Sequence, residues 1–95
     1  MFVSAASAWE LATKYRLGRF SQAEVVVRQF AGVVERLGAS TLAIDVNHAL
    51  RAGGFEWDHR DPFDRMLAAQ ALIENLVLVT PDPVFRELGG LAVLW

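Results

Sequence analysis

Two aspartates, Asp61 and Asp64, lie close together in the stretch HRDPFDRMLAAQALI, which covers residues 59–73. The second part of this stretch, from Met66 to Ile73, is apolar apart from Gln70. A nearly all-apolar pattern predicts a buried helix. The two carboxylates therefore stand at the entrance of the best core helix of the chain. Carboxylate oxygens are ligands that Mg²⁺ and Mn²⁺ prefer, so this stretch is the first candidate for chemistry.

Two further acids follow predicted strands. Glu10 comes after a short strand at the start of the chain, and Asp82 comes just after the apolar run LVLVT at residues 76–80. Ligands of parallel sheets bind beyond the carboxyl ends of the strands, so we expect all these acids at one edge of the sheet. Carboxylates gathered there repel one another unless a divalent cation lies between them. Such a cation can activate water and stabilise a phosphodiester under in-line attack.

Each acid also has a purely structural interpretation. Glu10 could be the capping-box partner of Ser7 or the ion-pair partner of Lys14 one helical turn later. Asp61 has the pattern of a helix N-cap with Pro62 at the first helical position. We favour the cap as the role of Asp61.

The remaining polar candidates are equally open to two interpretations. Asp64, in the first turn, could merely complement the helix dipole. Asp82 precedes Pro83, which repeats the Asp-Pro pattern of a helix cap. His59 could be a metal ligand or a solvated side chain in a polar loop. Only the expected coincidence of the acids at one sheet edge favours a functional site.

Short apolar runs alternate with helical patterns, which is typical of α/β proteins with a mostly parallel sheet. The predicted order is β-α-α-β-α-α-β-α-β. The run 76–80 is continuously apolar, which predicts a strand covered on both faces. The first half of the chain is predicted to form a strand at 2–3, a turn at 4–7, helices at about 8–16 and 22–37, a strand at 41–44 and a helix at 46–52. Gly18 and Gly38 are the predicted stops of the first two helices, Ser21 and Glu24 are the capping pair of the second, and Asp45 caps the third. The second half is predicted to form a loop at 55–60, a helix at about 62–75, a strand at 76–80, a short helix after Pro83 and a strand at 91–94.

The composition bounds the class of protein. The chain has 95 residues, a net charge of −2, no cysteine and a hydrophobic fraction of 54%. One domain is the expectation for this length, and the apolar excess indicates burial against a partner or a second copy. The missing cysteines fit a cytoplasmic protein, and no apolar run is long enough for a membrane helix.

Three segments together resemble the PIN-domain toxins of the VapC type, and the resemblance runs in order along essentially the whole chain. They are SAASAWELATKYRLGR at 4–19, HRDPFDRMLAAQA at 59–71 and LVLVTPDPVF at 76–85. The resemblance implies a three-layer α/β/α domain with a mostly parallel sheet. It also implies a Mg²⁺- or Mn²⁺-dependent endoribonuclease, a VapB-type antitoxin as partner, an RNA substrate and a homodimer.

Carried over to this sequence, the resemblance makes Glu10, Asp64 and Asp82 the metal-binding and catalytic acids. Asp61 belongs to the same D-P-F-D signature but is not a principal ligand, and Thr80 matches a hydroxyl position beside the last acid. Both are therefore accessory candidates.

Several cations near the expected acidic edge could contact RNA phosphates; they are Lys14, Arg16, Arg60 and Arg65. Of these, Lys14 and Arg65 are the candidates we name, and salt bridges to neighbouring acids are at least as open a role for them.

The sequence departs from the family pattern at its start. The family begins with a central strand that ends in an aspartate, and residues 1–95 do not contain that segment. The sequence therefore resembles a single, N-terminally truncated PIN-like domain, for which we expect weak metal binding and little or no RNA cleavage. The alternative is a catalytically inactive remnant that binds an antitoxin or a copy of itself.

Overall fold

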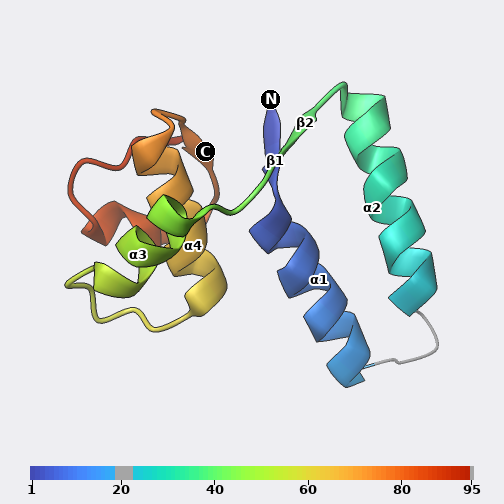
Figure 1. The fold of residues 1–95 in the computed structure, drawn as a ribbon, viewed down its shortest axis with the longest axis horizontal. Coiled ribbons are helices and arrows are strands. Elements are labelled where there is room, and N and C mark those ends of the chain that lie inside the picture. Colours follow the sequence, from blue (N-terminus) through green and yellow to red (C-terminus); the bar gives the residue numbers. More distant parts are fainter. Residues whose placement is uncertain (19–22, 95) are drawn as a thin grey trace. The chain divides into compact units, whose positions relative to one another are not determined.

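The computed structural model describes residues 1–18 and 23–94, which fall into two compact units, Met1–Ala43 and Ile44–Trp95. Helices and short strands alternate along both units, in the order predicted from the sequence (Figure 1). Each unit is described by itself below. The prediction of one domain over residues 1–95 stays a prediction.

The described residues of the first unit form two parallel strands and two helices. Its elements are β1 (Phe2–Ser4), α1 (Ala5–Gly18), α2 (Ala23–Leu37) and β2 (Ser40–Leu42). β1 pairs with β2 in parallel, with Val3 opposite Thr41. The two helices, which follow β1 and precede β2 in the chain, lie side by side and run in opposite directions (Figure 1).

Helix α1 begins earlier than the sequence pattern indicated. The predicted turn at residues 4–7 is wrong, because the helix already starts at Ala5. The Ser4 hydroxyl accepts a hydrogen bond from the Ala6 amide at 3.0 Å, so Ser4 satisfies a donor of the first turn. Ser7 lies inside the helix and cannot be its N-cap. The second predicted capping pair cannot be compared, since Ser21 lies outside the described residues.

The end of α2 follows the predicted glycine stop. Gly38 has a positive φ of 61°, a conformation that glycine adopts without steric penalty. Its amide donates to the Glu35 carbonyl at 3.1 Å, and the Ala39 amide donates to the Val34 carbonyl at 3.1 Å. This pair of bonds is the Schellman motif, and it returns the chain to β2.

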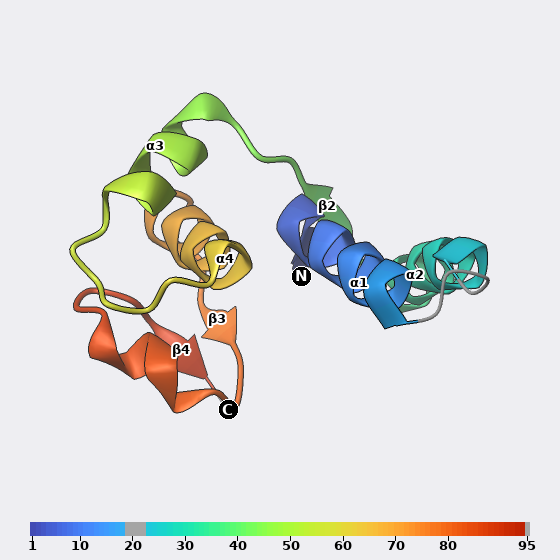
Figure 2. The same cartoon turned by 90° about the horizontal axis from the view of Figure 1, so that it is seen from below.

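The second unit packs two helices beside a small parallel strand pair. Its elements are α3 (Val46–Gly54), α4 (Pro62–Ile73), β3 (Leu78–Val79), the 3₁₀ helix η2 (Pro83–Glu87) and β4 (Val93–Leu94). Helix α3 packs against α4, and β3 lies next to α4 (Figure 2). Its buried apolar side chains are mostly small; they are Ala52, Ala68, Ala69, Ala71 and Phe85.

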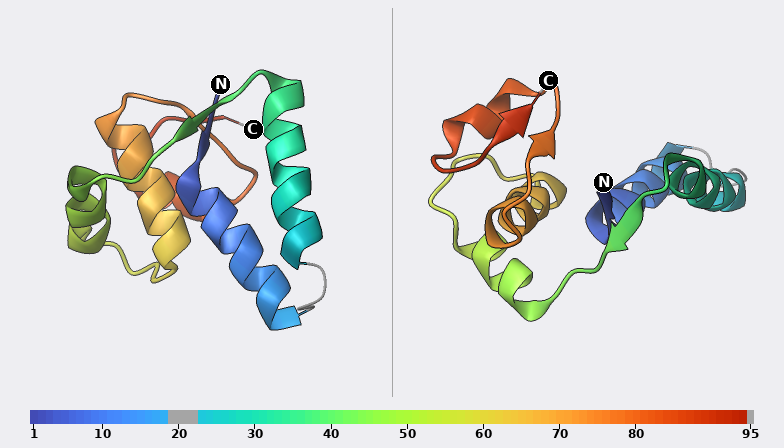
Figure 3. Two further views of the ribbon diagram at one scale, coloured as in Figure 1. Left: turned by 45° about the vertical axis from the view of Figure 1, so that its right-hand side comes forward. Right: turned by 90° about the horizontal axis from the view of Figure 1, so that it is seen from above.

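Strands β3 and β4 run in the same direction, with Leu78 opposite Val93 and Val79 opposite Leu94 (Figure 3). The predicted strand at 76–80 is shorter in the structure, partly because Leu76 is hydrogen-bonded to the end of α4. Asn75 takes a positive φ of 54°, and the Leu76 amide donates back to the Ala71 carbonyl at 2.8 Å.

The prediction that both faces of this strand are covered is wrong. Val77 and Val79 are exposed, and Leu94, which lies opposite Val79, is exposed as well. One face of the β3–β4 pair is therefore apolar and open to solvent.

The element order and the two parallel strand pairs confirm the predicted α/β class. No helix in the part of the chain that the structure describes has the length and apolar character needed to cross a bilayer.

Candidate functional site

Asp61 caps helix α4, as the sequence predicted. Its Oδ1 atom accepts hydrogen bonds from the amides of Phe63 at 2.9 Å and Asp64 at 3.1 Å. Pro62 occupies the first helical position, where its missing N–H leaves no donor unsatisfied. The cap fixes the point at which α4 starts, and thereby fixes the position of Asp64 in the first turn.

Asp64 is paired with a histidine from the preceding loop. Asp64 Oδ2 and His59 Nε2 lie 2.7 Å apart, and the two side chains are 18% and 27% exposed. His59 is therefore not a solvated side chain. The first turn of a helix favours a carboxylate, because the unpaired amides give that end a partial positive charge.

The loop before α4 has a two-residue alternation that the sequence reading missed. Three aromatic rings are half-buried, and the charged residues between them are exposed; the rings are Phe55, Trp57 and His59, and the charged residues are Glu56, Asp58 and Arg60. The Trp57 ring contacts His59 at a centroid distance of 5.1 Å and Phe85 of η2 at 6.0 Å. The pattern F-x-W-x-H is the sequence signal that could have placed His59 on the inner side of the loop.

Arg65 holds this loop against α4. Its guanidinium donates four hydrogen bonds, at 2.6–3.0 Å, to the carbonyls of Ala52, Phe55, Trp57 and His59. These bonds use most of the N–H groups that a guanidinium carries. Arg65 thus fixes the backbone around His59, and the phosphate contact predicted for Arg65 is not tested by this arrangement.

Asp82 has a capping role in the structure. Its Oδ1 accepts from the Val84 amide at 3.0 Å, and its own amide donates to the Thr80 hydroxyl at 3.2 Å. Asp82 is exposed. Within the described part of the second unit, Asp82 joins no group of three or more acid or histidine side chains whose ligand atoms lie within 4.8 Å of one another.

Glu10 lies on α1 in the first unit. Its carboxylate forms an ion pair with Lys14 Nζ at 2.8 Å, the partner that the helical spacing allowed. The pair accounts for the local position of Glu10 and leaves its predicted metal-binding role untested.

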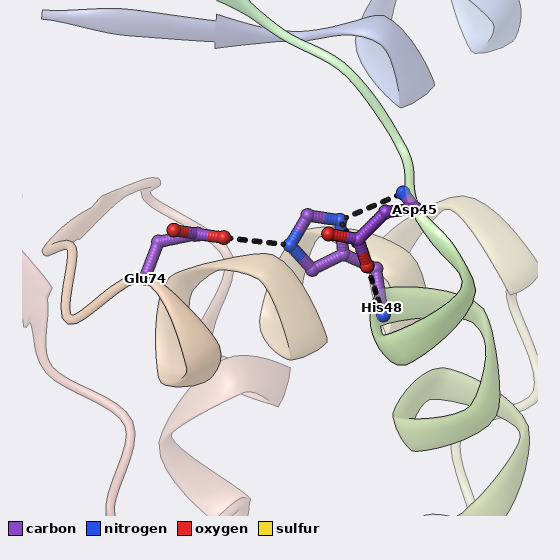
Figure 4. A group of neighbouring side chains, drawn as sticks. All are labelled: Asp45, His48 and Glu74. Atoms are coloured by element: carbon purple, nitrogen blue, oxygen red, sulfur yellow. Dashed lines mark hydrogen bonds and ion pairs between the residues drawn. The ribbon is translucent and has the colours of Figure 1, made fainter.

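A second histidine, which the sequence reading did not single out, bridges the two helices of the second unit (Figure 4). His48 is 1% exposed, and its Nδ1 accepts a hydrogen bond from the Asp45 amide at 3.1 Å. That bond places the ring proton on Nε2, which donates to Glu74 Oε1 at 3.1 Å. The Asp45 carboxylate in turn accepts from the His48 amide at 2.9 Å, which completes a capping box at the start of α3.

The His48 group does not fit a cation. One ligand atom each of Asp45, His48 and Glu74 lie within 4.8 Å of one another. Each ring nitrogen already has a hydrogen-bond partner, however: the Asp45 amide at Nδ1 and the Glu74 carboxylate at Nε2 (Figure 4). A neutral imidazole with its acceptor nitrogen occupied has no lone pair left for a metal. The group therefore ties the start of α3 to the end of α4.

The Asp64 carboxylate at the start of α4 has the ligand chemistry that a hard cation takes. Asp64 Oδ2 meets His59, and the two oxygens of a carboxylate together carry about four lone-pair sites. Mg²⁺ and Mn²⁺ take such oxygen ligands and keep several of their waters, so a partly exposed carboxylate suits them. Asp61, by contrast, uses Oδ1 for the helix cap.

Comparison with protein families identifies the family of the chain. No curated protein matches the chain in sequence. The PIN domain family matches residues 1–91, a range that covers the first unit, most of the second unit and every candidate acid. The chain belongs to the PIN domain family.

Proposed function

We propose that this chain is a metal-dependent endoribonuclease of the VapC type, the toxin of a toxin–antitoxin pair. PIN domains are typically nucleases that depend on a divalent metal and commonly bind RNA. The observation that carries the proposal is the family match over residues 1–91. The Asp64 carboxylate at the first turn of α4, oriented by its short contact with His59, supports it further.

In the proposed reaction, Asp64, Glu10 and Asp82 hold Mg²⁺ or Mn²⁺. When bound, the cation would activate water and stabilise charge on the phosphodiester. Asp61 acts as the cap that positions Asp64, and Thr80 supports the backbone at Asp82. Lys14 contacts the RNA backbone as an exposed cation.

The proposed partners are an RNA substrate, a VapB-type antitoxin and a second copy of the chain, all in the cytoplasm. Exposed apolar side chains support protein partners. On α3, Val46 and Leu50 are 73% and 71% exposed and lie one helical turn apart. Apolar residues at this spacing form a continuous stripe that a partner could cover.

Cleavage of RNA by the purified chain tests the proposal. The assay uses Mg²⁺ or Mn²⁺, with EDTA and the substitution Asp64→Asn as controls. Because the resemblance implies a further aspartate on a strand that residues 1–95 do not contain, a version extended by such a strand is assayed in parallel. We expect weak or no cleavage by the 95-residue chain and EDTA-sensitive cleavage by the extended version. An extended, folded version without metal-dependent cleavage would contradict the proposal.

The second candidate function is a catalytically inactive interaction module. The exposed apolar face at Val79 and Leu94, which are neighbours in the β3–β4 pairing, favours it. Light scattering measures whether the chain self-associates, and a hydrophobic dye measures whether it exposes apolar surface. Self-association that is lost in the substitution Val79→Glu supports the module, and a monomer that exposes no apolar surface to a hydrophobic dye contradicts it.

A further inference from the structure

We propose that His59 is a positioning residue that holds the Asp64 carboxylate ready for its cation. This inference rests on the proposed function, since it assigns His59 a role at the same site. His59 itself binds no metal in this account; its Nε2–H donates to Asp64 Oδ2.

The first argument is the contact itself. A separation of 2.7 Å is short for a nitrogen donor, as expected when the acceptor is a carboxylate. Both side chains are more than half buried, so water competes weakly for either partner. The bond therefore restricts the rotamer of Asp64 and leaves the carboxylate in one orientation.

The second argument is the support behind the ring. Asp64 and Arg65 are neighbours on α4, and they hold the same loop residue in two ways. Asp64 contacts the His59 side chain, and Arg65 Nη1 donates to the His59 carbonyl at 3.0 Å. The Trp57 ring packs against the imidazole from within the loop. The backbone and ring of His59 are thus both fixed, as a donor that orients another group requires.

The third argument comes from how metal-binding carboxylates are used in proteins. Such carboxylates are usually held by outer hydrogen-bond donors, and loss of one donor lowers metal affinity by about 10–100-fold. Asp64 has such a donor in His59, which is held in place by contacts unrelated to metal. Asp82 has backbone and hydroxyl contacts of a helix cap instead, so its orientation depends on η2.

Binding of Mn²⁺ to the purified chain tests the inference, measured by electron paramagnetic resonance and by line broadening of the amide signals at the start of α4. The variants are His59→Gln and His59→Asn, two amides of the same chemistry but different reach. The glutamine Nε2 can occupy the position of the histidine Nε2, and the asparagine amide cannot reach it. We expect His59→Gln to stay within about threefold of the parent affinity and His59→Asn to lose about tenfold or more. His48→Gln, which alters the other histidine, should leave the affinity unchanged.

The outcomes separate the inference from the proposed function. Equal affinities for His59→Gln, His59→Asn and the parent would overturn the positioning role while leaving the metal site in place. Equal losses of Mn²⁺ affinity in both variants would overturn it too. Such losses would show that the affinity depends on the imidazole ring as a whole and not on a donor at the position of Nε2. A parent chain that binds no Mn²⁺ at the start of α4 overturns the proposed metal site, and the positioning role with it. Amide spectra of each variant establish that it is folded.

Discussion

Two histidine–carboxylate pairs lie in the second unit, and their surroundings give them different roles. His48 is 1% exposed, and both of its ring nitrogens have hydrogen-bond partners, from the Asp45 amide and the Glu74 carboxylate. His59 is 27% exposed and meets Asp64 in the first turn of α4. The first pair joins two helix ends. The second pair lies at the start of a helix and is partly exposed.

The contrast shows that a contact between histidine and carboxylate can have a purely structural role, as it has at His48. Around His48, the Asp45 backbone amide donates to Nδ1 and the Glu74 carboxylate accepts from Nε2, so both ring nitrogens are used (Figure 4). The arrangement around His59 instead orients one carboxylate. Substitutions in the two pairs, and in the residues that hold the start of α4, show whether stability and metal binding depend on different residues.

The largest effect on stability is expected at His48. The substitution His48→Ala removes a buried ring, breaks the capping box of α3 and leaves the Asp45 amide without its acceptor. Together these losses should lower the free energy of unfolding by about 3 kcal/mol. Urea unfolding followed by circular dichroism measures the change. A loss well below 1 kcal/mol would show that the buried pair is not the structural link described above.

Arg65→Lys should be the next most destabilising change. A lysine ammonium cannot reproduce the planar fork that meets four carbonyls, so the loop before α4 loses most of its support. We expect a decrease of about 2 kcal/mol in the free energy of unfolding, and faster hydrogen exchange of the loop amides. The matched control is Lys14→Gln on α1, where an exposed ion pair contributes only about 0.3–0.5 kcal/mol. Comparable losses of stability in Arg65→Lys and Lys14→Gln would contradict the role of Arg65 in holding the loop against α4.

Asp61→Ala separates capping from metal binding at the start of α4. Loss of the acceptor for the Phe63 and Asp64 amides should reduce stability by about 1 kcal/mol. Asp61→Asn keeps a side-chain oxygen and should keep most of that stability. It should also retain Mn²⁺ binding. A large loss of Mn²⁺ affinity in Asp61→Asn would show that Asp61 is a ligand as well as a cap.

Glu74→Gln should have the smallest effect. The glutamine oxygen can still accept from His48 Nε2, and the glutamate is partly exposed. The expected change in the free energy of unfolding is about 0.5 kcal/mol, from replacing a charged acceptor by a neutral one. Thermal unfolding of the two proteins at equal concentration measures it. A change above about 2 kcal/mol would mean that the charge of Glu74, rather than its oxygen, holds the helix ends together.

The parts of the fold that depend on neighbouring residues were predictable from the sequence. Caps at Asp45, Asp61 and Asp82 and the stop at Gly38 are confirmed, because each is made by a side chain or a conformation within a few residues. The start of α1 was not predicted, because the serine pattern at 4 and 7 offered two local acceptors.

The site was predictable only in part. The position of Asp64 in the first turn follows from the Asp-Pro cap, so its candidacy came from sequence. The contact with His59 requires the loop to fold back on α4, and Arg65 makes that fold through carbonyl groups, which every residue type carries. The residue types of its partners therefore give no sequence signal for the role of Arg65. His48 is similar, since its partner Glu74 is far away in sequence.

The most direct test of the account compares two isosteric changes, Asp64→Asn and Glu74→Gln, by Mn²⁺ binding to the purified chain. Each change removes one negative charge from one histidine–carboxylate pair and leaves the size of the side chain unchanged. We predict that Asp64→Asn abolishes Mn²⁺ binding at the start of α4 and that Glu74→Gln leaves it intact. Unchanged binding in Asp64→Asn, or a comparable loss in Glu74→Gln, would contradict the assignment of the two pairs.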